Sequence, residues 1–312
     1  MHAGCVPGGR YQTGPVPALA AVQRSMRAAA APVSSGRAGA PAGATSAHLA
    51  RELGELAWAG VLSPWGCTAP GSRVLLRLLG QTQQPAATPC RTPVVLVLGY
   101  GGHRACWLPL ELELRRAGFV NVHTVAYNPL TSLSGIAASL RTTCHRALDS
   151  AGSSHLHLVG HSLGGVVVRY AVQRMGLAPV VHTAVTVAAP HRGTSVATLG
   201  WGPAVRAIRP GSPVLEDLAR GADPGDVRWV AYYSDCDLIV RPDSARLDEA
   251  GRTAVNIPIP DAGHLGILRA PVFLRSVRRL LLAAEKPTTT PFPTCRADAA
   301  VPATGRGGAL AA

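Results

Sequence analysis

Ser162 is the residue of this 312-residue chain that most clearly points to chemistry, because it lies in Gly160-His161-Ser162-Leu163-Gly164. This is the pattern G-x-S-x-G, in which a serine occupies a tight turn between a strand and a helix. The flanking sequence fits, since an apolar run ends at Gly160 and a helical pattern follows Ser162. A chance match in a glycine-rich chain would lack these flanks. We therefore predict Ser162 as a nucleophile at a helix N-terminus, where developing negative charge is favoured.

A serine hydroxyl needs a neighbouring base to accept its proton. Where this motif occurs, the chain order is Ser, then Asp or Glu, then His, so the base should follow Ser162. Three histidines do so: His182, His191 and His264. His182 falls within a predicted strand, and His191 follows that strand too early for this order. His264 lies in a loop between the last predicted strand and the last predicted helix, where a base can reach over the serine, and it is the predicted base.

The acid that orients the base should follow the predicted strand Val227–Tyr233. Asp235 and Asp237 both lie there, and the spacing alone does not separate them. Asp243 comes after Pro242 and is typical of a turn. Asp261 is close to His264 in sequence, which is typical of a solvated loop charge.

An acyl-transfer site also needs two backbone N–H donors for an oxyanion. The residue after the nucleophile, Leu163, supplies the first predicted donor. The second should come from the loop after the first strand, Leu98-Gly99-Tyr100-Gly101-Gly102, whose glycines allow close approach of the backbone. We predict the N–H of Tyr100 as this donor.

Predicted strands and predicted helices alternate along the chain, and they must position these residues. Continuous apolar β-branched runs, joined by helical patterns, predict an α/β fold with a mostly parallel sheet of about six strands and helices on both faces. The predicted strands are Pro93–Leu98, Val120–Tyr127, His155–Gly160, Val180–Ala188, Val227–Tyr233 and Ala254–Ile259. The predicted helices are Cys106–Ala117, Gly135–Ala151, Leu163–Met175 and Pro271–Ala284.

Five segments of the chain, spread over about Pro93 to Leu282, together resemble bacterial triacylglycerol lipases and esterases. The nearest pattern is that of the small, nearly lid-less Bacillus-type lipases and related actinobacterial lipases. The resemblance implies the α/β-hydrolase fold and hydrolysis of carboxylic esters, with no metal and no organic cofactor. The segments are Leu98–Gly102, Gly160–Gly165, Ala189–Thr194, Asp237–Val240 and Gly263–Gly266.

The resemblance also bears on individual residues. In the family the acid stands just before an apolar triplet, which favours Asp237 over Asp235, and the second oxyanion donor matches Tyr100. The chain departs from the family at Leu98-Gly99, where His-Gly is usual. That histidine is not catalytic, so the departure puts only the support of this loop in question.

The predicted substrate is a small-molecule or lipid ester. A thioesterase, a phospholipase or an acyltransferase would use the same three residues, and these activities remain alternatives. A non-catalytic binding module on this fold would normally have lost part of the set. Oligomeric state is left open.

The composition at both ends of the chain differs from the middle. Residues 1–45 are rich in Ala, Gly, Pro and Ser and predict a disordered leader, and residues 286–312 predict a disordered tail. The domain should therefore cover 46–285, opening with an amphipathic helix at His48–Val61. A cap-like segment at about 195–225, with apolar residues such as Trp201 and Ile208, predicts either an acyl-chain groove or an ordinary packed surface helix.

Charge and composition narrow the choice of partners. The net charge is +13, but the arginines are scattered and Lys286 is the only lysine, so nucleic-acid binding is not expected. Weak contact with an anionic lipid surface remains an open expectation. Hydrophobic residues make up 47% of the chain and charged residues 15%, which suits a large packed core.

The cysteine spacing and the search for targeting signals do not narrow the predicted function further. The seven cysteines form no CxxC pair and no metal spacing. Cys67 with Cys90, or Cys106 with Cys144, could form a disulfide, and free buried thiols are the alternative.

No apolar run approaches the roughly 18 residues of a membrane span. No signal peptide is readable, so a cytoplasmic location is the default expectation, with secretion possible if the start is misassigned.

Overall fold

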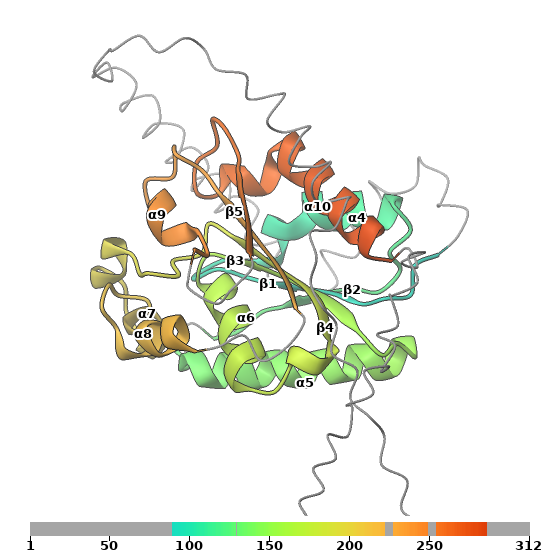
Figure 1. The fold of residues 1–312 in the computed structure, drawn as a ribbon, viewed down its shortest axis with the longest axis horizontal. Helices are drawn as coiled ribbons and strands as arrows, with labels where there is room; N and C mark the ends of the chain where they lie inside the picture. The colour runs from blue at the N-terminus through green and yellow to red at the C-terminus, as the bar shows by residue number, and fades with distance from the viewer. Residues whose placement is uncertain (1–88, 129, 222–226, 249–253, 286–312) are drawn as a thin grey trace, which may run out of the picture.

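The computed structural model describes residues 89–285, except 129, 222–226 and 249–253 (Figure 1). The predicted leader, the predicted helix at His48–Val61 and the predicted tail lie outside the described residues. Within the described ranges, no helix is long and apolar enough to cross a membrane.

A single six-stranded parallel sheet forms the centre of the described structure, in the order β2-β1-β3-β4-β5-β6. This confirms the predicted fold class and every predicted strand, to within a few residues at the ends. The chain runs from β1 outward to β2 and then returns to β3 on the other side of β1, so the connections change direction there. The strands are β1 Val94–Val97, β2 Val122–Val125, β3 Leu156–His161, β4 Val181–Val187, β5 Arg228–Tyr233 and β6 Ala254–Pro258.

Helices cover both faces of the sheet, as Figure 1 shows. Helices α5 (Leu133–Ala151) and α6 (Leu163–Arg174) lie on one face, and α4 (Leu108–Arg116) and α10 (Pro271–Ala284) on the other. Two buried apolar clusters result, one on each side of the sheet. Because the central strands are buried on both faces, β1 is apolar at every position, and β3 is buried throughout although it contains His157 and His161.

Local sequence explains where the helices begin and end. In α5 the hydroxyl of Ser132 accepts a hydrogen bond from Gly135 N–H, and Gly152 ends the helix with φ of 61°. The predicted helix at Cys106–Ala117 begins instead as a short 3-10 turn, η1 (Arg104–Trp107). Pro109 then occupies the first turn of α4, where its missing N–H costs nothing.

Helix α6 is buried on more than one side. Val166, Val167 and Ala171 are buried, and Val168 and Arg169 on other sides of the helix are buried too. The reason is that α6 packs between the sheet, α5 and a later helix. The Arg169 guanidinium is accommodated there because Nη2 donates to the carbonyl oxygen of Leu218 at 2.7 Å.

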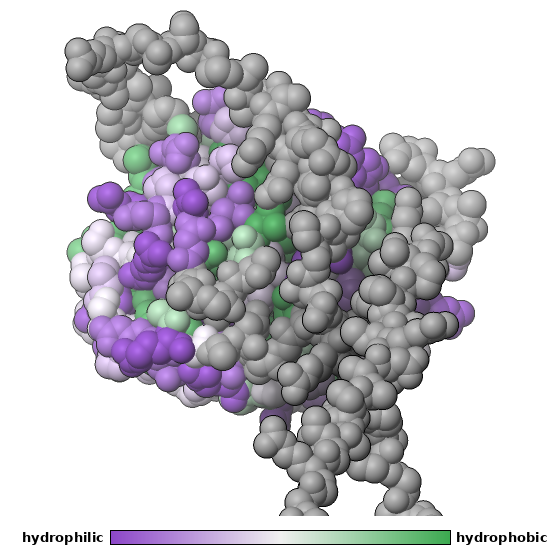
Figure 2. All heavy atoms as spheres, viewed as in Figure 1, coloured by the Kyte–Doolittle hydropathy of each residue, from purple (hydrophilic) through white to green (hydrophobic). Residues whose placement is uncertain are grey.

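The cap-like segment consists of η3 (Ser195–Thr198), α7 (Pro203–Arg206) and α8 (Pro213–Arg220). Helix α8 presents Leu215 and Leu218 to the core, while its outer surface is hydrophilic, as the lower left of Figure 2 shows. Helix α8 is thus a packed surface helix, whereas residues of η3 and α7 line the cavity described below. Three more short helices were not predicted: η2 (Ala178–Val180), α9 (Pro242–Ala245) and η4 (Gly266–Arg269).

Cys106 and Cys144 are not joined in a disulfide. Cys144 belongs to the apolar cluster on the α5 and α6 face, whereas Cys106 packs against the cluster on the α4 and α10 face. The sheet separates them, so the suggested pairing of Cys106 with Cys144 is wrong. The partner suggested for Cys90, Cys67, lies outside the described residues.

Candidate active site

Ser162 occupies a sharp turn between β3 and α6. Its φ of 52° and ψ of −126° are a strained conformation for a residue with a side chain. Two backbone hydrogen bonds hold the turn: Ser162 N–H donates to the carbonyl oxygen of Val187 at 2.8 Å, and Gly165 N–H donates to that of Ser162 at 2.9 Å. The serine is thereby fixed at the N-terminus of α6, where amide groups have no acceptor within the helix.

The glycines around the serine are required by close packing. A Cβ atom on Gly160 would lie 2.6 Å from the backbone carbon of Gly164. A Cβ atom on Gly164 would lie 2.5 Å from the carbonyl oxygen of Val97, in the neighbouring strand. Both distances are far inside van der Waals contact, so the motif has glycine here for steric reasons.

Asp237 and His264 form a buried pair. The Oδ2 atom of Asp237 lies 2.8 Å from Nδ1 of His264, and both side chains are almost fully buried. The other carboxylate oxygen, Oδ1, accepts the N–H groups of Ile239 and Val240, each at 2.8 Å. An ionised carboxylate held in this way fixes the imidazole with its second nitrogen, Nε2, available to a neighbouring group.

The other candidates lie elsewhere. Asp235 and Asp261 are exposed, and the exposed Asp243 pairs with Arg241 at 3.4 Å. His191 is buried, with Nε2 3.1 Å from Oγ1 of Thr186 and its backbone N–H on the carbonyl of Ser244. His182 lies in β4, among His155 and His157, away from Ser162.

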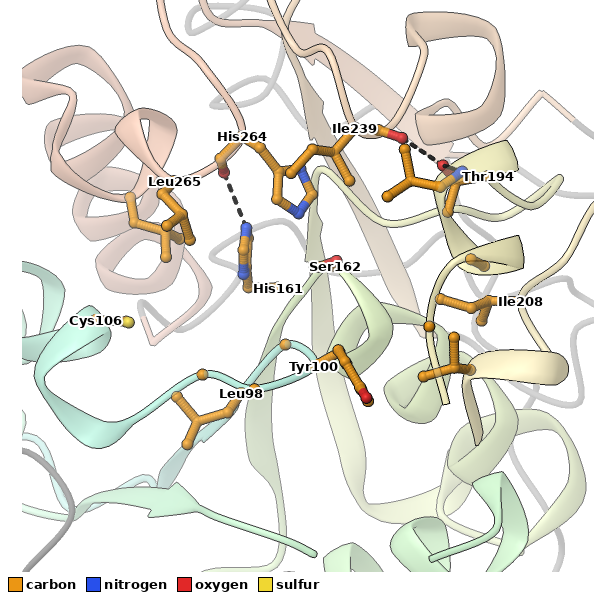
Figure 3. Close-up of a pocket in the computed structure, with 18 of the residues that line it drawn as sticks. Leu98, Tyr100, Cys106, His161, Ser162, Thr194, Ile208, Ile239, His264 and Leu265 are labelled. Atoms are coloured by element: carbon orange, nitrogen blue, oxygen red, sulfur yellow. Dashed lines mark hydrogen bonds between the residues drawn. The ribbon is translucent and has the colours of Figure 1, made fainter. Parts of the chain in front are cut away.

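A cavity of about 530 Å³ contains Ser162 and His264 in its wall. Figure 3 shows the His264 ring and Tyr100 on opposite sides of Ser162. One half of the cavity is lined by apolar residues of the cap-like segment: Val196, Ala197, Leu199, Val205 and Ile208. The other half is lined by residues that include Leu98, Cys106, Trp107, Leu265 and Leu268. The cavity lies at the carboxyl ends of β1 and β3, where the connections change direction, which is where sheets of this kind bind ligands.

The loop after β1 approaches the serine closely. A Cβ atom on Gly99 would lie 3.1 Å from Cβ of Ser162, so the backbone there runs beside the nucleophile. Tyr127 supports the loop by donating its hydroxyl to the carbonyl oxygen of Leu98 at 2.9 Å. The loop therefore has a support of its own although Leu98 replaces the histidine usual in the family. Leu163, the other predicted donor, is the first residue of α6.

His161 was missed by the sequence analysis. It is the last residue of β3, and its Nε2 lies 3.0 Å from the carbonyl oxygen of His264. Burial, and then the charge of His264, lower the pKa of His161 to about 3. The motif offered no signal for this contact, because the residue before the serine is unrestricted in G-x-S-x-G.

Two comparisons with known proteins bear on the fold. The family model for palmitoyl protein thioesterase matches residues 93–218. The mature lipase BlEst2 from Bacillus licheniformis superposes with a TM-score of 0.55 at 16% identity, covering 64% of this chain and 96% of that one. The chain has the α/β-hydrolase fold. This confirms the likeness to bacterial lipases at the level of fold.

Two further solved structures are similar over most of their own length. A monoacylglycerol lipase from Paleococcus ferrophilus has a TM-score of 0.50 at 19% identity, covering 64% of this chain and 98% of that one. Est1E from Butyrivibrio proteoclasticus has a TM-score of 0.50 at 16% identity, covering 65% and 92%.

Proposed function

We propose that this chain hydrolyses carboxylic esters of acyl chains, with Ser162 as nucleophile, His264 as base and Asp237 as orienting acid. The observation that carries the proposal is the buried bond of 2.8 Å between His264 and Asp237, in a cavity whose wall also contains the strained Ser162. A serine on a tight turn, a base near it and an acid behind the base are the parts that acyl transfer needs.

In the first half of the reaction, His264 Nε2 accepts the hydroxyl proton of Ser162 as Oγ attacks the ester carbonyl carbon. The carbonyl oxygen becomes an oxyanion, which the backbone N–H groups of Leu163 and Tyr100 stabilise. Asp237 stabilises the imidazolium that forms. The carbon–oxygen bond to the alcohol then breaks, and His264 returns the proton to the leaving alkoxide, which leaves as the alcohol.

In the second half, a water molecule attacks the acyl-enzyme. His264 accepts one proton of the water, and a second oxyanion forms in the same site. The bond between the acyl carbon and Ser162 Oγ breaks, Oγ recovers its proton from His264, and the carboxylic acid leaves. The two halves consume one ester and one water and return the side chains to their starting state.

The apolar half of the cavity supports medium or long acyl chains as substrates. Val205 and Ile208 are buried side chains that line it, and each methylene group they shield from water contributes about 0.8 kcal/mol of transfer free energy. Lipases and a monoacylglycerol lipase are among the similar structures, which is in keeping with this choice.

A thioesterase is the second candidate, and the match to the palmitoyl protein thioesterase model favours it. A thioester places the same acyl chain and the same carbonyl in the site, and differs only in its sulfur leaving group. The same residues would act in the same order.

A lipid surface is the proposed partner for delivery of such substrates. Exposed apolar side chains lie in the cavity lining or next to it in sequence: Leu199 lines the cavity and is 81% exposed, and Trp201 (81% exposed) and Leu238 (47% exposed) follow or precede the lining residues Gly200 and Ile239. Tyr100 donates its hydroxyl to the carbonyl of Trp201 at 3.2 Å, so this rim adjoins the oxyanion loop. Exposed apolar side chains can enter a bilayer, and scattered arginines are attracted to its anionic surface. Co-sedimentation with anionic vesicles should decrease in Trp201→Ser and stay unchanged in Val120→Ser, which alters an exposed valine that does not line the cavity.

The test of the proposed function is a panel of matched oxyesters and thioesters with acyl chains from acetyl to palmitoyl. We expect hydrolysis of the longer chains, and we expect Ser162→Ala to lower kcat by roughly three to six orders of magnitude. A fluorophosphonate should label the wild-type protein once, at Ser162. Labelling that persists in Ser162→Ala would assign the nucleophile to another residue.

A further inference from the structure

We infer that His161 is a positioning residue for the reaction: its ring holds the main chain of His264, so that the base is fixed from both ends. The inference rests on the proposed function for the identity of the base. It assigns a role to the residue before the nucleophile, which the motif leaves unrestricted.

The first observation is that two different groups hold His264. Asp237 binds the ring at Nδ1, at 2.8 Å, whereas His161 Nε2 lies 3.0 Å from the backbone carbonyl oxygen of His264. With the bond to the carboxylate alone, the loop that carries His264 could shift. A ring held at one atom can rotate about that atom when its own backbone moves. The bond from His161 fixes that backbone to the end of β3, which is part of the rigid sheet and precedes Ser162 directly.

The second observation concerns the direction of this bond. A carbonyl oxygen only accepts hydrogen bonds, so Nε2 of His161 must carry the proton and donate it. Burial lowers the pKa of His161 to about 3, so the ring is uncharged at neutral pH. A neutral donor is what this place needs, because a positive charge on His161 would oppose the formation of the imidazolium on His264.

The third observation is the packing of the two rings. Their centroids lie 4.7 Å apart with an angle of 48° between the planes. The rings of His161 and Trp107 pack in a T-shaped arrangement, with centroids 6.4 Å apart. A Cβ atom on Gly99 would lie 2.9 Å from Nδ1 of His161, so the oxyanion loop also confines the ring. His161 therefore contacts the base and the loop proposed to bind the oxyanion, and a displacement of its ring would disturb both.

The test compares substitutions that keep or remove the donor. In His161→Gln the side-chain amide nitrogen can reach the position of Nε2, so the bond to the His264 carbonyl can form. In His161→Asn the amide is one methylene shorter and cannot reach. His161→Phe keeps a ring but has no donor. His157→Asn is the matched control, because His157 is a buried histidine of the same strand at the opposite end, bonded to Glu285 at 2.9 Å.

The rate is measured per active site titrated with fluorophosphonate, so that unfolded protein does not count. We expect kcat to fall roughly tenfold to a hundredfold in His161→Asn and His161→Phe, with KM within about threefold, because small misplacement of a reacting group costs about this much. His161→Gln should keep kcat within about threefold of the wild type if it restores the bond. His157→Asn should lower the unfolding temperature and leave kcat per active site unchanged.

A second readout does not depend on hydrolysis. The proton on Nδ1 of His264, bonded to Asp237, should give a downfield NMR resonance in the wild type and in His161→Gln. The resonance should broaden or move in His161→Asn and His161→Phe, because the ring is no longer held in one place. Variants that all keep the wild-type resonance and kcat would overturn the inference, as would a loss in His161→Gln equal to that in His161→Asn.

The two proposals fail in different ways. A wild-type protein that cleaves no ester or thioester, but whose resonance responds to the substitutions as expected, would overturn the proposed function and leave the positioning of His264 standing. A wild-type protein that cleaves esters, with His161 variants that cleave them equally well, would overturn only the inference about His161.

Discussion

The Oδ2 atom of Asp237 lies 2.8 Å from Nδ1 of His264, although 26 residues separate the two in the chain and Asp261 lies much nearer to His264 in sequence. Parallel strands end at the same edge of a sheet, so the turn after β5 and the loop after β6 meet in space. The two N–H groups of Ile239 and Val240 keep Asp237 facing inward, whereas Asp235 two residues earlier faces solvent.

This arrangement predicts different effects for the two aspartates. Asp237→Asn should lower kcat by roughly three to four orders of magnitude, because an amide no longer stabilises the required tautomer and the imidazolium of His264. Asp235→Asn is the matched control, and its kcat should stay within about twofold of the wild type because exposed substitutions seldom matter. Steady-state hydrolysis of one ester by both variants checks this, and a greater loss in Asp235→Asn would contradict the assignment.

A second prediction concerns the elbow. Gly164→Ala should destabilise the fold by about 3 kcal/mol or more, because its Cβ atom would lie 2.5 Å from backbone atoms of β1, which cannot move aside. Gly176→Ala is the control: φ there is 73° but no atom lies within 4 Å, so only the conformational cost of about 1–2 kcal/mol remains. Urea unfolding of both variants measures the difference. Equal losses would show that the elbow tolerates a side chain.

The sheet and the position of Ser162 could be predicted because their signals are local. Continuous apolar runs such as that of β1 mark buried parallel strands, and glycines at fixed spacing mark the turn after β3. Asp235 and Asp237 could not be separated by spacing, because a turn after a strand has no periodicity. Their difference arises from which side chain the backbone of Ile239 and Val240 can reach.

The role inferred for His161 could not be predicted at all. Its partner is a main-chain atom 103 residues later, and a carbonyl oxygen leaves no mark in a sequence. The burial of Arg169 is a similar case, since an arginine at helical spacing suggests a solvent-facing side. Only the packing of α8 over α6 supplies the carbonyl oxygen that it bonds.

A third prediction follows from the low pKa of His161. Because burial lowers this pKa to about 3 from an ordinary value near 6.5, the unfolded chain binds one more proton than the folded protein between these pH values. The contribution to stability is fully present above pH 6.5 or so and is lost as the pH falls toward 3, by about 1.4 kcal/mol per pH unit.

His161→Gln removes this proton, so its free energy of unfolding should fall less steeply than that of the wild type between about pH 6 and pH 4. Urea titrations at several pH values give the two slopes. Ser150→Gln, at an exposed position of α5, replaces no titratable group and should keep the slope of the wild type. A His161→Gln slope equal to the wild-type slope would mean that His161 takes up no proton on unfolding.

The last prediction concerns acyl-chain length. Val196 lines the apolar half of the cavity and is 40% exposed, so Val196→Phe can fill part of that half without overpacking the core. Wild-type kcat/KM should rise from acetate to decanoate, because each additional methylene removed from water is worth about 0.8 kcal/mol. If the larger side chain displaces about two methylenes, kcat/KM for decanoate should fall by roughly tenfold, while that for acetate stays within about twofold. Val120→Phe, at an exposed position that precedes β2 and does not line the cavity, should alter neither value. A wild-type kcat/KM that falls steadily beyond butyrate would make the chain a short-chain esterase, because the apolar half of the cavity would then contribute nothing to binding the transition state. The assignment of Ser162, His264 and Asp237 would be unaffected by that result, since acetate and decanoate present the same carbonyl to the same serine.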